Sequence, residues 1–82
     1  MNIFEFADCI NQELRITYYP NQNNRFSASF LDGEVAERGL LIGVYGNGKT
    51  PKEAMDMYVE KIRGKELKFS NGNYYIVPQS IE

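Results

Sequence analysis

Two segments of the chain carry apolar residues at helical spacing. The first opens with Asn2-Ile3-Phe4-Glu5, where a capping residue is followed three positions later by glutamate, and it predicts a short helix over residues 3–12. The second begins with Thr50-Pro51-Lys52-Glu53, an N-cap, a first-turn proline and a capping-box glutamate, and it ends before Gly64. Its apolar positions share one face and are Ala54, Met55, Tyr58, Val59 and Ile62. This helix is expected to cover one face of a sheet.

Several other segments alternate between apolar and polar residues, as strands do. Residues 14–19 and 25–30 alternate on either side of a polar turn, which predicts an antiparallel hairpin. Its expected buried face consists of Leu14, Ile16, Tyr18, Phe26, Ala28 and Phe30. Residues 40–45 predict a third strand, apolar on both faces. Asn71-Gly72 lies between two further short strands, at 67–69 and 74–77.

These elements predict an α+β fold in a single domain over residues 1–82. We expect an antiparallel meander sheet with the helices packed on one face, in the order α-β-β-β-α-β-β. The sequence contains no internal repeat and no linker, so no second domain is predicted.

The composition limits the classes of function. A chain of 82 residues is too small for a nucleotide-hydrolysing core with a substrate site. Nine Lys and Arg against eleven Asp and Glu give a net charge of −2, so no global charge draws it to nucleic acid or to an anionic membrane. Cys9 is the only cysteine, histidine is absent, and no stretch predicts a signal peptide or a membrane span. We expect a soluble cytoplasmic protein that is not an enzyme and holds no cofactor or metal ion.

The stretch Gly43-Val44-Tyr45-Gly46-Asn47-Gly48-Lys49-Thr50 satisfies the phosphate-loop pattern G-x-x-x-x-G-K-[ST]. Pro51 argues against such a loop, because proline has no N–H to donate to a phosphate and its ring pushes Thr50 out of the helical conformation. We interpret the stretch as the end of a buried strand, a tight Gly-Asn-Gly turn and a helix cap. Lys49, at the mouth of the turn, is the one residue of the pattern to which we assign a possible function.

A polar-turn hairpin, a third strand and a helix opened by Gly48-Lys49-Thr50-Pro51-Lys52-Glu53-Ala54 span Leu14 to Ile62. In these features the chain resembles the HicB antitoxin domain. It is also similar to small HicB-like proteins of phages and prophages of Gram-positive bacteria, which share this helix start and the exit Ile62-Arg63-Gly64-Lys65-Glu66-Leu67. The resemblance implies a HicB-like core at about residues 14–64, with an added N-terminal helix and a C-terminal hairpin. The resemblance further implies that this core is not catalytic and that it binds and inhibits a small ribonuclease.

The order α-β-β-β-α over residues 3–63, with a glycine turn before a basic helix start and Glu53-Ala54, also resembles the double-stranded-RNA-binding domain. Members of that family contact RNA phosphates with lysines at the helix start. In this chain Pro51 and Met55 occupy two of the positions where lysine is expected. Binding of duplex RNA would therefore have to be weak.

Taken together, these features favour a non-catalytic protein, phage or prophage encoded, that docks on a nuclease-type or toxin partner. Pairing of edge strands between two copies would accompany this. The candidate partner-binding residues are Lys49, Lys52, Tyr19, Glu34 and Glu37.

Overall fold

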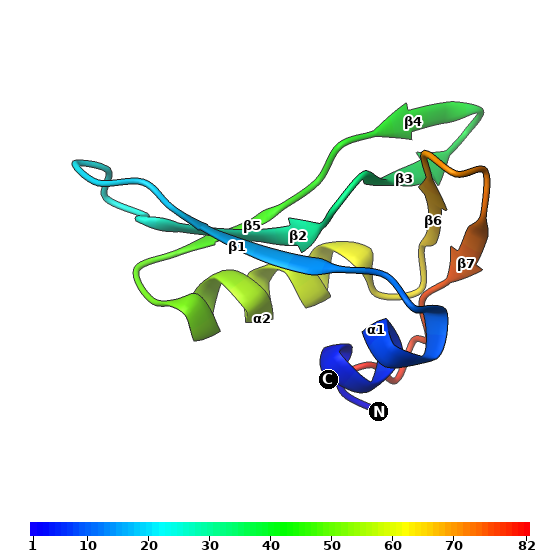
Figure 1. Cartoon of the computed structure of the whole chain (residues 1–82), viewed down its shortest axis with the longest axis horizontal. Helices are drawn as coiled ribbons and strands as arrows, with labels where there is room; N and C mark the ends of the chain where they lie inside the picture. The colour runs from blue at the N-terminus through cyan, green and yellow to red at the C-terminus, as the bar shows by residue number, and fades with distance from the viewer.

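The computed structural model describes all of residues 1–82 and has two helices and seven strands (Figure 1). The elements are α1 (Ile3–Ile10), β1 (Leu14–Tyr18), β2 (Phe26–Phe30), β3 (Gly33–Glu37), β4 (Leu40–Ile42), β5 (Gly46–Gly48), α2 (Pro51–Ile62), β6 (Glu66–Phe69) and β7 (Tyr74–Ile76). All strand pairs are antiparallel. The α+β class is confirmed.

The strands are divided between two sheets, of order β1-β2-β5 and β4-β3-β6-β7, where a single meander was predicted. Figure 1 shows why the two are continuous: β2 runs on into β3 and β4 runs on into β5, so one long bent ribbon joins the sheets. The predicted third strand at 40–45 is shorter than expected: only residues 40–42 pair with β3, and residues 43–45 belong to no strand. The charged segment before it is itself a strand, because Val35 is buried and the left-handed backbone of Arg38 and Gly39 makes the turn.

Both helices lie on the same side of the β1-β2-β5 sheet (Figure 1). Phe30 stands at the centre of the core, where its ring meets Phe6 of α1 at 6.1 Å, Tyr58 of α2 at 6.1 Å and Phe69 of β6 at 5.7 Å, all edge to face. The five apolar residues predicted to face the sheet from α2 are all buried. Edge-to-face contacts between such rings add to the stabilisation that burial alone provides.

The helix ends follow the sequence signals closely. Asn2 and Glu5 form the complete capping box of α1, and this helix ends at Ile10, two residues earlier than predicted, because Asn11 adopts a left-handed conformation. At α2, the Thr50 hydroxyl accepts the Glu53 N–H at 3.1 Å, as predicted for an N-cap. The Glu53 carboxylate reaches one residue further back and accepts the N–H of Lys49 at 2.8 Å.

The β1–β2 hairpin extends beyond the core, so part of its predicted buried face is wrong. Ala28 and Phe30 are buried, but Ile16 and Tyr18 are exposed because β1 is an edge strand, and the Tyr18 ring stays exposed although it contacts that of Phe26 at 5.1 Å. Figure 1 shows the hairpin tip reaching past the start of α2. The tip therefore presents side chains to solvent on both faces.

Candidate binding surfaces

The Gly46–Gly48 segment is a strand that packs against α2, and the predicted Gly-Asn-Gly turn is wrong. Gly48 pairs with Phe26 and Asn47 with Ser27 across the β2–β5 ladder. A methyl group on Gly46 would overlap the carbonyl oxygen of Ala54, and one on Gly48 would lie 2.5 Å from the Ala54 nitrogen. The glycines thus allow strand and helix backbones to come into contact.

The start of α2 is occupied by its own side chains. The Glu53 carboxylate takes the Lys49 N–H, and Lys52 pairs with Asp56 at 2.6 Å, an interaction that raises the pKa of the Lys52 amine through the hydrogen bond and the opposite charge. The Lys49 side chain is exposed and forms no ion pair. Of the two candidate lysines, only Lys49 therefore has an amine that forms no ion pair within the chain.

The two candidate glutamates do not form a common acidic patch. They lie three positions apart on β3 and so point to opposite faces of the sheet. Glu37 pairs with Lys65 at 2.7 Å. This hydrogen bond is the main cause that lowers the pKa of the Glu37 carboxyl, and the positive charge of Lys65 is the second. Glu34 stands opposite Lys68 on β6. Glu34 thus has a basic residue opposite it on β6, and Glu37 has one just before the start of β6.

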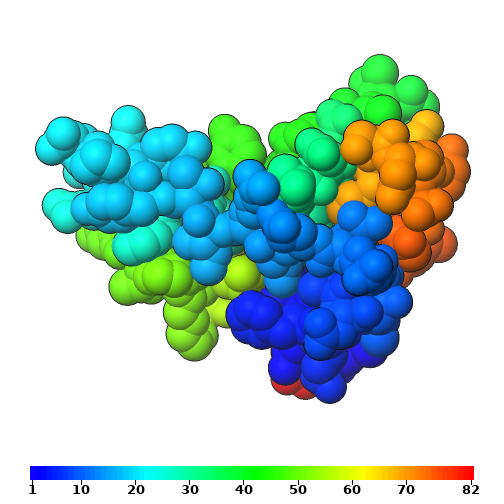
Figure 2. Space-filling model, in the orientation of Figure 1, coloured from blue at the N-terminus to red at the C-terminus, as the bar shows by residue number.

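A hollow of about 720 Å³ lies on the face of the β1-β2-β5 sheet that points away from α2, and we call it the polar groove. Its lining residues are Thr17, Tyr19, Gln22, Asn23, Asn24, Ser27, Ser29, Tyr45 and Asn47. The outline of the molecule dips on this side between the hairpin and the β3–β4 end (Figure 2). No carboxylate lines the groove.

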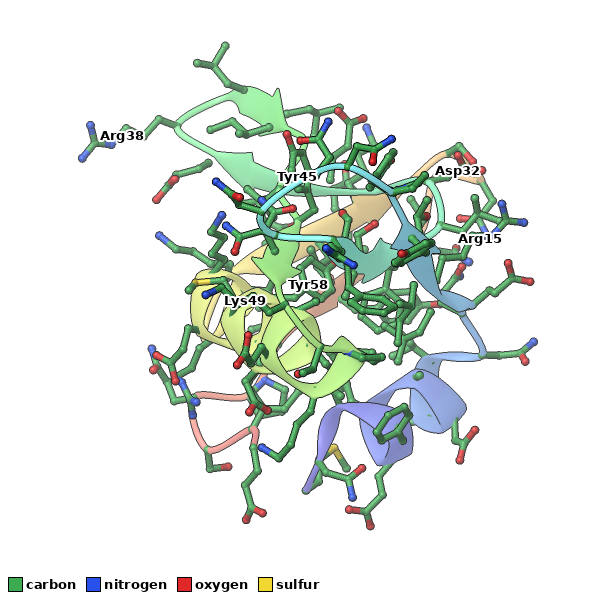
Figure 3. The ribbon with its side chains drawn as sticks, turned by 90° about the vertical axis from the view of Figure 1, so that its left-hand side faces the viewer. Arg15, Asp32, Arg38, Tyr45, Lys49 and Tyr58 are labelled. Carbon is green, nitrogen blue, oxygen red and sulfur yellow. The ribbon has the colours of Figure 1, made fainter.

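Three cations stand around the polar groove. Arg25 and Lys49 line an adjoining hollow with Gln22 and Asn23. Lys61 reaches over from α2, donates to the Tyr45 carbonyl oxygen at 2.9 Å and lies 5.9 Å from the centroid of that ring. Figure 3 faces this end of the molecule and labels Tyr45 and Lys49.

Of the five candidate residues, Tyr19 lines the polar groove and Lys49 lines the hollow that adjoins it, while Lys52, Glu34 and Glu37 line neither. Tyr45 was missed because it was placed in a buried strand, yet it is exposed. In the sequence Arg25, Ser27 and Ser29 alternate with Phe26, Ala28 and Phe30, and this alternation indicates a polar face of the hairpin here.

A second exposed surface is the apolar edge, formed by Leu40, Leu41 and Ile42 of β4. These side chains are 65%, 49% and 40% exposed, although the segment was predicted to be a buried strand. The prediction failed because β4 is the outermost strand of its sheet and pairs only with β3. Apolarity on both faces here indicates an uncovered edge.

No three acidic or cysteine side chains are grouped so that they could hold a metal ion. Neither helix has the length and apolar character needed to cross a membrane. Comparisons with protein-family models, with curated proteins and with solved structures find no match to this chain. The resemblances to the HicB and double-stranded-RNA-binding families therefore stay predictions.

Proposed function

We propose that this protein is a non-catalytic cytoplasmic binding module that docks on a protein partner through the apolar edge. The observation that carries the proposal is the run of three exposed aliphatic side chains on an outermost strand. An edge strand offers unpaired N–H and C=O groups to another chain, and proteins usually protect such edges with lysine, proline or a covering segment. β4 has no charged residue and no proline, so it suits addition of a partner strand.

A nuclease-type or toxin partner is favoured by the HicB resemblance, which also supports a phage or prophage origin. Charge supports the same class of partner. Residues 1–48 carry three arginines against six acids, a balance of −3, and a negative net charge speeds association with a basic, nucleic-acid-handling protein. Glu37 contributes less to this attraction than its charge suggests, because Lys65 is bound to it.

Duplex RNA is a weaker candidate. Binding of duplex RNA in the manner of the double-stranded-RNA-binding domain requires unpaired lysine or arginine side chains at the start of the second helix. In this chain Glu53 occupies that helix start, and Lys52 is paired with Asp56. These contacts lower the positive potential that phosphates would need there.

The experiment is affinity capture from the native host with quantitative mass spectrometry, using the wild type, Leu41→Lys and Ile76→Lys. Leu41→Lys places a charge on the apolar edge, whereas Ile76→Lys is a matched control at an exposed apolar residue of β7, the opposite edge of the same sheet. We expect a partner that the wild type and Ile76→Lys retain and Leu41→Lys loses. The purified partner should cleave RNA more slowly in the presence of the wild type than in that of Leu41→Lys.

Two results would contradict the proposal. One is capture of the same proteins, in equal amounts, by the wild type and both variants. The other is a wild-type dimer in analytical ultracentrifugation that Leu41→Lys converts to monomer, with no partner captured, because the edge would then serve self-association alone.

A further inference from the structure

The side chains that line the polar groove are free to bind a ligand. None of the hydroxyl and amide groups of Thr17, Ser27, Ser29 and Asn47 takes part in a side-chain hydrogen bond of the chain. The same holds for the amides of Gln22, Asn23 and Asn24 in the hairpin tip. The groove thus offers a row of donors and acceptors that only water satisfies.

The charge around the groove favours an anionic ligand. Arg25, Lys49 and Lys61 border it and form no ion pair, whereas Arg15, Lys52, Arg63 and Lys65 are all paired elsewhere. The nearest acids of α2 are Glu53, Asp56 and Glu60, which line a further hollow that shares Asn24 and Asn47 with the groove. Asp56 is paired with Lys52 and Glu60 with Arg63, so three unpaired cations face one unpaired carboxylate, that of Glu53, and the charge next to the groove is positive.

Two aromatic rings complete the chemistry of the groove. Tyr19 and Tyr45 both line it and are both about half exposed, and the Lys61 contacts hold the Tyr45 backbone and ring in place. Exposed rings next to cations form stacking platforms for nucleobases, and polar side chains between them suit sugar hydroxyls and base edges.

From these three features we propose that the polar groove binds a single strand of nucleic acid. One base stacks on Tyr19 and another on Tyr45, while Arg25, Lys49 and Lys61 neutralise the intervening phosphates. A duplex is excluded as the preferred ligand because its base faces are buried in the stack, and three strands span only about 10 Å. The groove and the apolar edge lie on different sheets, so this inference is independent of the proposed function.

The test is fluorescence anisotropy with a labelled dodecamer of mixed sequence, as RNA, as DNA and as the annealed RNA duplex. We expect the single strands to bind more tightly than the duplex. Three phosphate contacts predict a slope of about −2 for log K against log salt concentration, from roughly −0.7 per contact. Comparing the RNA and DNA dodecamers shows which sugar the groove prefers.

Two sets of variants test the assignment of residues. Tyr19→Ala and Tyr45→Ala should each weaken single-strand binding by about 5- to 100-fold, whereas Tyr74→Ala, an exposed tyrosine of β7, should leave it unchanged. The double variant Arg25→Gln/Lys49→Gln should reduce the salt slope by about 1.4, from roughly −0.7 per lost contact, and Arg38→Gln/Lys68→Gln should not alter it. Circular dichroism verifies that each variant is folded.

Three outcomes would overturn the inference. They are no binding of single strands at low salt, tighter binding of the duplex, and equal losses from the groove variants and their controls. Poly-glutamate serves as a competitor of another chemical class: if it binds as tightly as the dodecamer and the tyrosine variants do not weaken it, the groove recognises acidic protein rather than nucleic acid.

Discussion

Replacing Gly46 with alanine should destabilise this protein far more than replacing Gly43, which reverses what the phosphate-loop pattern predicts. Gly43 is one of the two glycines that the pattern demands, whereas Gly46 occupies one of its variable positions. In the structure a methyl group on Gly43 has no heavy atom within 4 Å. A methyl group on Gly46 overlaps the Ala54 carbonyl oxygen and lies 2.9 Å from the Cα of Tyr58.

The size of the effect follows from which atoms obstruct the methyl group. The obstructing atoms belong to the backbone of α2, so relief requires the whole helix to move away from β5, opening the packing around Tyr58. Overpacking of a core that can adjust costs about 1–3 kcal/mol, and a rigid backbone places Gly46→Ala at or above the upper end, about 3 kcal/mol. Gly43→Ala should fall within about 1 kcal/mol of wild type and tend to stabilise, because alanine restricts the unfolded chain.

Urea denaturation followed by far-ultraviolet circular dichroism measures both changes. A domain of 82 residues has a free energy of unfolding of roughly 4–12 kcal/mol, so a loss of about 3 kcal/mol is readily resolved. In thermal melts the same loss corresponds to a fall in Tm of about 12–24 °C. A Gly46→Ala variant within about 1 kcal/mol of wild type, or a larger loss in Gly43→Ala, would refute the packing argument.

Two further predictions concern α2. Tyr58→Phe should lower the free energy of unfolding by about 1–3 kcal/mol in urea titrations, because it removes the oxygen that accepts the Phe30 N–H at 3.0 Å in the core. Burial raises the pKa of Tyr58 to about 12, although the Phe30 N–H opposes this shift, so the unfolded tyrosine ionises first. The associated stability is complete below about pH 10 and declines toward pH 12, a slope that Tyr58→Phe should lose. Thr50→Ala should lower the free energy of unfolding by about 0.5–2 kcal/mol, because it removes the hydroxyl that accepts the Glu53 N–H. Lys52→Ala breaks only the exposed pair with Asp56 and should change the free energy of unfolding by less than about 1 kcal/mol. Equal losses in the two variants would contradict the capping role of Thr50.

The local elements could be predicted where a side chain contacts its own backbone neighbours. The Asn2–Glu5 capping box and the Thr50 cap depend on contacts within four residues, and the Asn71-Gly72 turn depends on backbone freedom at Gly72, whose φ is +89°. Each of these predictions is confirmed because the physical cause lies inside the sequence window that predicts it.

The candidate binding surfaces could be predicted only in part. Tyr19 and Lys49 are predicted as exposed residues near turns, but their places in two adjoining hollows depend on the pairing of β2 with β1 and with β5, which the sequence does not show. Tyr45 and the apolar edge were assigned to a buried strand, because a run of apolar residues has the same pattern whether its strand is covered or outermost.

The sequence by itself determined the α+β class, the helix caps and the face that α2 buries, since these depend on periodicity and on neighbouring residues. Tertiary structure decided the division into two sheets and the exposure of β4, because strand order is set by pairing between residues far apart in the chain. It also decided the meaning of Gly46 and Gly48. Their lack of a side chain has a structural role only because α2 folds back onto β5, and this contact turns an apparent phosphate loop into a site of close packing.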